Sequence, residues 1–169
     1  MSETQGKPVA GLEARIRRLE DKLDIYELIA GYGPAVDTRS ANATAAIWAQ
    51  SGRYDFGGEP LEGAEAVGGL VDLDEHVDLV ERGCAHVMAM PMVFVDGDRA
   101  VATGYSRVYL HEGDGWKVKR TSANRWELVR TEQGWKVENR INRLMDGSPD
   151  GLALLGRGIA DNAKRKVRT

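Results

Sequence analysis

The sequence lacks the features of secreted and membrane-spanning proteins. Its 169 residues include a single cysteine, Cys84, so no disulfide can form within the chain, and a free thiol suits a reducing compartment. No run of about 18 apolar residues is present, and the first residues, MSETQGKPVAGLEARI, hold no apolar segment typical of a signal peptide. We therefore expect a cytoplasmic protein that does not enter a membrane.

An excess of charge of one sign is also missing. The chain has 23 Lys and Arg against 26 Asp and Glu, a formal net charge of −3. Such a mixed surface gives no electrostatic reason to expect a nucleic-acid partner. The one basic run, from Lys164 to Arg168, lies at the extreme C-terminus and is typical of a solvated tail.

What is present indicates one domain with a helical first part. Hydrophobic residues make up 42% of the chain, enough for a sizeable core at this length. Apolar residues at three- and four-residue steps predict an amphipathic helix over residues 12–32 that packs on the core. Its apolar positions begin with Leu12, Ile16, Leu19, Leu23 and Tyr26.

Glycine and proline predict where this helix ends. Gly31, Gly33 and Pro34 disfavour helical continuation, so residues 35–37 are expected at a bend or in a distorted last turn. A second helix is expected from about residue 40 through Trp48 to near Gly52, followed by a short strand at 53–56 and a short helix at 64–71.

The second part of the chain is rich in strand-forming residues. Runs at 85–95, 100–111, 116–130 and 135–145 carry many β-branched and aromatic residues, with short glycine-containing turns between them. These runs predict an antiparallel sheet that is long enough to bend, covered on its concave face by the helices. The expected fold is α+β with a pocket between the layers: a flexible segment at 1–11, a domain at 12–147, and a tail at 148–169 with one short helix near 152–159.

Two residues stand out as candidates for chemistry. His86 alternates with Met88, Met90 and Met92 along its predicted strand, which places it on an apolar face, where it is either a core histidine or a base. Asp37 follows an apolar run and, if buried, needs a cation or hydrogen-bond donors. His86 is a suitable partner for it.

The other histidines favour plainer interpretations. His76 lies in an acidic segment that matches no metal-binding spacing, so we expect a solvated position and no metal site. His111 precedes a turn and is expected to be exposed. Tyr32 continues the apolar stripe of the first helix, so its side chain either joins the core or directs its hydroxyl into the pocket.

Several motifs together resemble a known family. Tyr32 and Asp37 close the first helix as Tyr-x-x-x-x-Asp, Trp48 follows, and then comes Arg-Tyr-Asp-Phe-Gly-Gly at 53–58. His-x-Met-x-x-Pro begins at His86, Asp-Gly-Asp-Arg-Ala spans 96–100, and Gly-Trp-Lys-Val spans 134–137. This order resembles the SnoaL-like branch of the nuclear transport factor 2-like superfamily over residues 12–147. The resemblance implies a cone-shaped α+β barrel, with N-terminal helices on a strongly bent, mixed but mainly antiparallel sheet.

Within that branch the chain looks similar to scytalone dehydratase, bile acid 7α-dehydratase and hexachlorocyclohexane dehydrochlorinase. The resemblance implies a cofactor-independent elimination in which Asp37 and His86 form a dyad, His86 as general base and Asp37 as its orienter. Tyr32 would act as a donor, and a cation on the last strand would be Arg140, with Arg143 as its rival. The substrate-binding residues expected are Tyr54, Met88, Met90, Tyr105, Asn124 and Arg140.

The resulting expectation is a lyase of dehydratase type, acting on a hydrophobic steroid, polyketide or aromatic molecule. An isomerase or cyclase would use the same dyad, and a non-catalytic binding or assembly domain would need neither residue. We also expect a homo-oligomer, because Trp116, Trp126 and Trp135 exceed what the outer sheet face of a monomer needs. The resemblance leaves trimer and dimer open.

Overall fold

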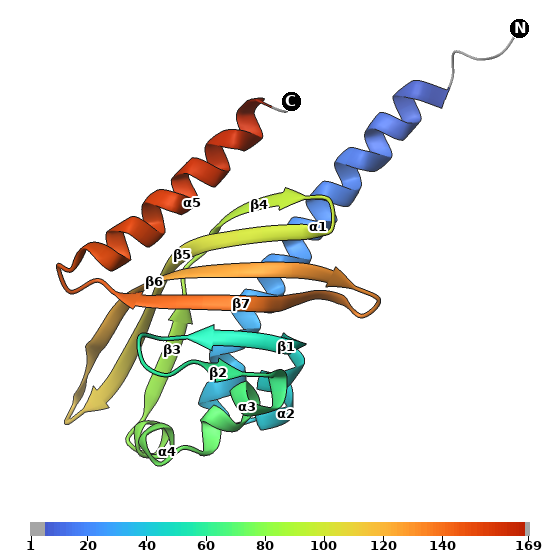
Figure 1. The fold of residues 1–169 in the computed structure, drawn as a ribbon. Coiled ribbons are helices and arrows are strands. Elements are labelled where there is room, and N and C mark those ends of the chain that lie inside the picture. The colour runs from blue at the N-terminus through green and yellow to red at the C-terminus, as the bar shows by residue number, and fades with distance from the viewer. Residues whose placement is uncertain (1–5, 168–169) are drawn as a thin grey trace, which may run out of the picture.

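The structure is a computed structural model that describes residues 6–167, and residues 1–5 and 168–169 lie outside the described part. Five α-helices, one 3-10 helix and seven strands follow one another along this part of the chain (Figure 1). In chain order they are α1 (Gly6–Asp37), α2 (Ala41–Ala46), β1 (Trp48–Asp55), β2 (Leu61–Glu62), α3 (Ala64–Gly68), η1 (Gly69–Asp72), α4 (Asp74–Glu81), β3 (Cys84–Met88), β4 (Met92–Asp96), β5 (Arg99–Glu112), β6 (Gly115–Thr131), β7 (Gly134–Leu144) and α5 (Pro149–Val167).

All seven strands form one mixed sheet. Their order is β2-β1-β7-β6-β5-β3. The remaining strand, β4, also pairs with β5, as β3 does. The pairing of β1 with β7 is parallel and the other pairings are antiparallel. The predicted α+β fold with a mainly antiparallel sheet is confirmed, and the sheet stays open because β2 and β3 end it without pairing to each other.

Helices cover both faces of this sheet. The inner face carries Ala102 and Trp126, which join Ile25, Ile29 and other residues of α1 in the hydrophobic core. The outer face carries Thr103, against which Gly158 of α5 packs directly. The sequence predicted only a short helix near 152–159 in the C-terminal segment. Instead α5 is 19 residues long and contacts β4 to β7 (Figure 1).

Tryptophans expected at an oligomer interface lie partly in the core. Trp126 is buried between the sheet and α1, and Trp135 is buried with its indole N–H donating to Asp21, 3.2 Å away. Trp116 remains exposed. The number of tryptophans on the strands therefore reflects internal packing and does not indicate an interface.

The first helix differs from the prediction at its C-terminal end. It does not end at Tyr32 but continues through Pro34, so that residues 35–37 form its last turn and not a bend. The amides of Thr38 and Ser40 still bond to the carbonyls of Pro34 and Ala35. A proline within a helix costs about 3 kcal/mol. Here the burial of Val36 and the anchoring of Asp37 offset that cost, so tertiary contacts override a local stop signal.

The N-terminal half of α1 also differs from the prediction. Its stripe of Leu12, Ile16, Leu19 and Leu23 was expected to pack on the core, yet all four side chains are about half or more exposed, from 45 to 63%. Figure 1 shows the reason, since this half of the helix extends beyond the edge of the sheet. The core contacts begin near Ile25.

Among the later strands, β5, β6 and β7 match their predicted runs to within two residues. The run at 85–95 is not one strand, because Pro91 and its neighbours separate β3 from β4, and both then pair with β5. The early elements also differ: α2 ends at Ala46, and β1 already begins at Trp48, where a helix had been predicted. Trp48 is buried against Trp126, so the sheet recruits this segment.

Candidate active site

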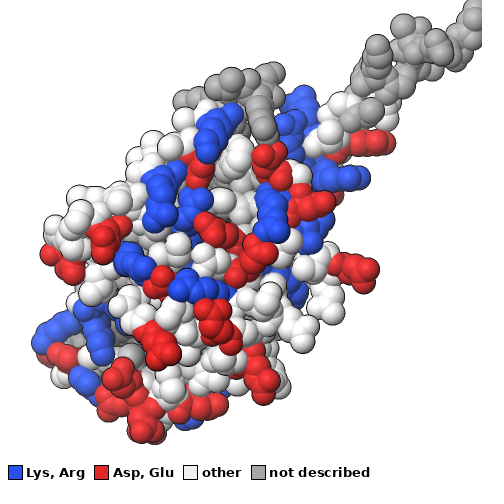
Figure 2. Space-filling model, viewed as in Figure 1, with Lys and Arg blue, Asp and Glu red and all other residues white. Residues whose placement is uncertain are grey.

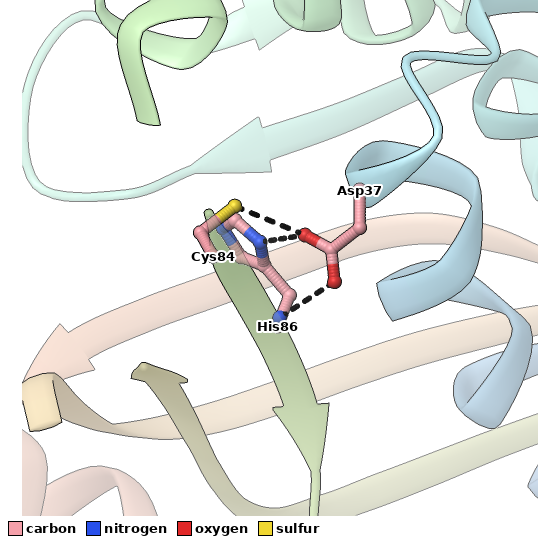
Figure 3. A group of neighbouring side chains, drawn as sticks. All are labelled: Asp37, Cys84 and His86. Carbon is pink, nitrogen blue, oxygen red and sulfur yellow. Dashed lines mark hydrogen bonds and ion pairs between the residues drawn. The ribbon is translucent and has the colours of Figure 1, made fainter. Parts of the chain in front are cut away.

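Asp37 and His86 come together where α1 ends beside β3 (Figure 3). One carboxylate oxygen of Asp37 lies 2.6 Å from His86 Nδ1, and the other accepts the backbone N–H of His86 at 2.8 Å. A carboxylate can only accept, so Nδ1 carries the proton and Nε2 of the neutral ring has a free lone pair. Asp37 thus fixes both the tautomer and the position of the imidazole.

The Asp37 carboxyl is held in its charged form. Burial alone would raise its pKa, but the hydrogen bonds from the ring and backbone of His86 outweigh burial and lower the pKa. Cys84 adds a weak bond from Sγ to Asp37 at 3.5 Å (Figure 3). Burial and the neighbouring Asp37 raise the pKa of the Cys84 thiol to about 11. Cys84 is therefore a thiol donor at neutral pH and no nucleophile.

The same three side chains are the group that could hold a metal ion among the described residues, with ligand atoms within 4.8 Å of one another. Two observations speak against a metal centre. The shortest contact, Nδ1 to the carboxylate, is a hydrogen bond that uses the ligand atoms of both residues. The raised pKa of Cys84 disfavours the thiolate that a metal needs. The donor set fits a hydrogen-bonded dyad better.

His76 was predicted to be solvated, and that prediction is wrong. It is buried on α4, its Nε2 lies 2.8 Å from the carbonyl of Val36, and its ring centre is 5.6 Å from that of His86. Burial lowers the pKa of His76, so the ring beside the dyad stays neutral. The signal for this burial was weak: His76 and Leu79 share one helical face in an otherwise acidic segment. His111 is exposed, as predicted.

A second polar cluster lies on the inner face around Arg140 of β7. Its guanidinium carbon sits 4.0 Å from the ring centre of Trp126, 4.2 Å from that of Tyr32 and 4.5 Å from that of Tyr54. Its Nε and Nη2 donate to Asn124 Oδ1 at 3.0 and 2.8 Å. Three aromatic faces and one amide therefore surround a fully buried cation.

Arg140 has no carboxylate partner among the described residues, and its Nη1 is buried without a hydrogen-bond partner there. Its rival Arg143 is different, because Nη1 and Nη2 of Arg143 bind both oxygens of Asp55 at 2.7 and 2.9 Å. A buried cation with an unused donor is costly unless something binds it. Of the two arginines, Arg140 is thus the one whose guanidinium keeps a donor without a partner among the described residues.

Tyr32 joins this cluster to the dyad. Its ring contacts Arg140 and Trp126, and Asp37 follows five residues later on the same helix, about 7.5 Å along the axis. Burial and the neighbouring Tyr54 raise the pKa of Tyr32, against a lowering effect of Arg140. The phenol therefore stays protonated and suits hydrogen-bond donation rather than proton transfer.

The structure places the remaining candidates unequally. Asn124 and Tyr54 are buried in the Arg140 cluster, and half-buried Met88 packs against the core. Tyr105 shares the outer face with Thr103, because side chains two positions apart on a strand point the same way, and it is 43% exposed. Met90 lies in the break between β3 and β4 and is 80% exposed. The alternation that put Met90 beside His86 fails because the strand ends at Met88.

A hollow of about 240 Å³ lies beside residues 26–30 of α1. It is lined by Tyr26, Ile29, Ala30 and residues 88–91, and by neither His86 nor Arg140. His86 and Arg140 are themselves closely packed, 9% and 2% exposed, while Asp37 is half-buried. The interior is therefore closed over the His86 ring and the Arg140 guanidinium.

Comparison with known proteins agrees with this architecture. The family model for the SnoaL-like domain matches residues 17–141. An NTF2-like protein with a cystatin-like fold from Novosphingobium aromaticivorans superimposes with a TM-score of 0.84 at 40% identity, covering 86% of this chain and 96% of its own. No curated protein matches the sequence.

Two more distant structures share the fold. Hexachlorocyclohexane dehydrochlorinase LinA-type3 from Novosphingobium barchaimii has a TM-score of 0.66 at 21% identity, covering 78% of this chain and 90% of its own. A protein of unknown function from Mycobacterium tuberculosis also gives a TM-score of 0.66, at 22% identity, with 84% and 94% covered. At these identities the likeness concerns the fold alone.

Proposed function

The chain belongs to the SnoaL-like family, and on that basis we propose that it is a cofactor-independent lyase in which His86 is the general base. The observation that supports this most is the pair of hydrogen bonds that the Asp37 carboxylate accepts, one from the ring and one from the backbone of His86. A carboxylate that orients an imidazole and stabilises the imidazolium is the arrangement that general-base catalysis requires.

The reaction begins with proton removal from carbon. Nε2 of His86 takes a proton from a carbon next to an activating carbonyl, and the electron pair of that C–H bond forms a new double bond as the neighbouring hydroxyl leaves. The imidazolium then returns its proton to the departing hydroxide, which leaves as water. Atoms and charge balance without a cofactor, and His86 ends in its starting state.

Arg140 and Tyr32 serve the substrate oxygen in this proposal. Negative charge develops on the activating carbonyl while the C–H bond breaks, and the unused Nη1 of Arg140 supplies a donor for it. The raised pKa of Tyr32 suits a phenol that donates a hydrogen bond without losing its proton. The low dielectric of the closed interior strengthens both interactions.

The substrate is proposed to be a hydrophobic alcohol of steroid, polyketide or aromatic type. Supporting this class are the aromatic rings of Tyr32, Tyr54 and Trp126 around Arg140. Met88, which packs against the same hydrophobic core, adds an apolar side chain. Because the interior is closed, binding requires that side chains or helices over the inner face move apart. Met88 lies at the hollow beside α1 and marks one route of entry.

The test is an elimination assay on a panel of hydroxylated steroids and polyketides that carry a carbonyl two carbons from the hydroxyl. The new conjugated double bond is followed by ultraviolet absorbance. His86→Ala should lower kcat by about 10²- to 10⁴-fold. His111→Ala, which alters an exposed histidine, is the matched control and should keep full activity.

Equal activity of the wild type and His86→Ala would remove His86 from the mechanism. Substrate recovered as a shifted double bond or a closed ring, with no loss of water, would make the protein an isomerase or cyclase that uses the same dyad. Saturable binding of panel compounds by both proteins without turnover would instead establish a binding domain.

A further inference from the structure

The N-terminal half of α1 carries an exposed apolar stripe that nothing in its own chain covers within the described residues. Val9, Leu12, Ile16, Leu19 and Leu23 are each 45 to 63% exposed. The helix cannot turn this stripe inward, because Asp21 on its other side is buried, paired with Arg130 at 2.7 Å and bonded to Trp135. Asp21 lies about 200° around the helix from both Leu19 and Leu23.

The spacing of this stripe is that of a coiled coil. From Val9 to Tyr26 the apolar residues alternate steps of three and four, the pattern of heptad positions a and d. Val9, Ile16 and Leu23 occupy a, and Leu12, Leu19 and Tyr26 occupy d. Two of the three a residues are β-branched and two of the three d residues are leucine, a combination that favours two parallel strands over three.

Charged residues flank the stripe, acidic ones along one side and basic ones along the other. Every e position, namely Glu13, Glu20 and Glu27, is acidic, while the g positions within the stripe, Arg15 and Lys22, are basic. In a parallel pair each g position faces the e position five residues later on the partner helix, so Arg15 meets Glu20 and Lys22 meets Glu27. In an antiparallel pair g would face g and e would face e, which sets like charges together.

From these observations we infer that residues 9–26 of α1 pair with the same segment of a second copy of this chain as a parallel two-stranded coiled coil. The observations behind this pairing do not depend on the proposed lyase activity. Figure 2 shows acidic and basic side chains mixed on the projecting helix, with neither sign dominating, which suits association of identical surfaces. The paired segment is about 27 Å long.

The apolar surface continues beyond the C-terminal end of the stripe. Tyr26, the last d residue, lines the 240 Å³ hollow together with Met90, whose side chain is 80% exposed. Pairing of the helices brings the two copies of this hollow towards each other. The exposure of Met90, which the fold of one chain leaves unexplained, is consistent with a contact between copies.

The first experiment measures self-association of the full-length protein by sedimentation and light scattering over a range of concentrations. The wild type should be a dimer at micromolar concentration. Ile16→Glu should raise the dissociation constant at least about tenfold, because each dimer loses two buried side chains. Ala14→Glu adds the same charge at the exposed f position and should leave the constant unchanged.

Both side chains are exposed in the single chain, so neither variant should alter the fold, and circular dichroism and the melting temperature check this. A monomeric wild type at every concentration would overturn the inference. So would a dimer that Ile16→Glu leaves intact, since the interface would then lie elsewhere.

The second experiment tests helix orientation through charge. Arg15→Glu should weaken a parallel dimer about three- to tenfold, because it sets two carboxylates opposite each other, and adding Glu20→Lys should restore the affinity. In an antiparallel pair Arg15→Glu would instead tighten association, since it would face basic g residues. Tightening by the single variant would reject the parallel arrangement.

Discussion

Arg140 combines features that rarely occur together in one residue. It is buried, without a carboxylate partner in the described chain, and held by three aromatic rings and Asn124. Because a buried charge costs several kcal/mol before it is compensated, replacement by an apolar side chain of similar length should not destabilise the protein. We expect Arg140→Met to leave the free energy of unfolding unchanged or raise it by about 1 kcal/mol, while activity falls at least about tenfold.

The control for this prediction is Arg143→Met. Arg143 makes a bidentate ion pair with half-buried Asp55, so its loss should cost about 0.5–1 kcal/mol of stability and leave activity intact. Urea denaturation and the elimination assay measure the two quantities. If Arg140→Met proves strongly destabilising and Arg143→Met does not, Arg140 has a structural role rather than the one assigned to it.

Asp37 supports a separate prediction about the tautomer of His86. Asn at this position keeps the shape but can donate a proton where the carboxylate only accepts, which favours the opposite tautomer of His86. Asp37→Asn should lower kcat by about 10²- to 10⁴-fold with little change in KM. Steady-state kinetics decide this, and an unchanged kcat would contradict the orienting role.

At the scale of elements, the close approach of α1 to β3 depends on Gly33. A Cβ added there would collide with the carbonyl oxygen of His86, whereas one added at Gly31 meets nothing within 4 Å. Gly33→Ala should therefore cost about 1–3 kcal/mol through overpacking, and it should separate Asp37 from His86 and lower activity. Gly31→Ala should stabilise the helix by about 0.5–1 kcal/mol.

Thermal melts and activity assays on both alanine variants provide the measurement. Equal melting temperatures for the two variants would show that α1 and β3 can move apart at Gly33 without a loss of stability. The proposed role of the contact in holding the dyad would then be wrong.

The sequence predicts the elements of this fold unevenly, for physical reasons. The three long strands follow from β-branched composition and glycine turns, which are local signals. Where tertiary contacts decide, local signals fail: the anchored Asp37 carries α1 past Pro34, and the sheet recruits Trp48 from a predicted helix. The long C-terminal helix was underestimated because its partner, the outer sheet face, is not visible in a local pattern.

The candidate site, too, is predictable where motifs indicate it and unpredictable where tertiary packing decides. Asp37 and His86 were paired through motif resemblance together with the rule that a buried carboxylate needs a partner, and the structure places them in contact. The burial of His76 and the outward position of Tyr105 depend on how helices and strands pack in three dimensions. The sequence names Arg140 ahead of its rival Arg143 only through the family resemblance, and the pairing of Arg143 with Asp55 is visible only in the structure.

For the whole molecule, pH should act on stability in two stages. The fold lowers the pKa of His76 below the ordinary value near 6.5, so the unfolded chain takes up a proton that the folded chain excludes. Stability is complete above about pH 6.5 and falls below it, by at most about 1.4 kcal/mol per pH unit for this group. The lowered pKa of Asp37 adds a second loss once the pH drops below about 4.

Urea midpoints at pH 7.5, 6.5 and 5.5 test the first stage. His76→Gln retains a donor for the Val36 carbonyl but cannot be protonated, so its midpoint should change less over this range than that of the wild type. His111→Gln, at an exposed position, should behave as the wild type. Parallel curves for His76→Gln and the wild type would assign the pH dependence to other groups.

One uninterrupted helix carries both the apolar stripe and Asp37. The angle around the helix axis between the stripe and the Asp37 side chain is therefore fixed by the number of residues between them. Each residue inserted between Tyr26 and Tyr32 would turn the stripe by about 100° relative to the carboxylate. An insertion of seven residues nearly restores the alignment, with a remaining offset of about 20°. Length variation in this stretch of α1 among related chains should therefore be rare and should occur in steps of about seven residues.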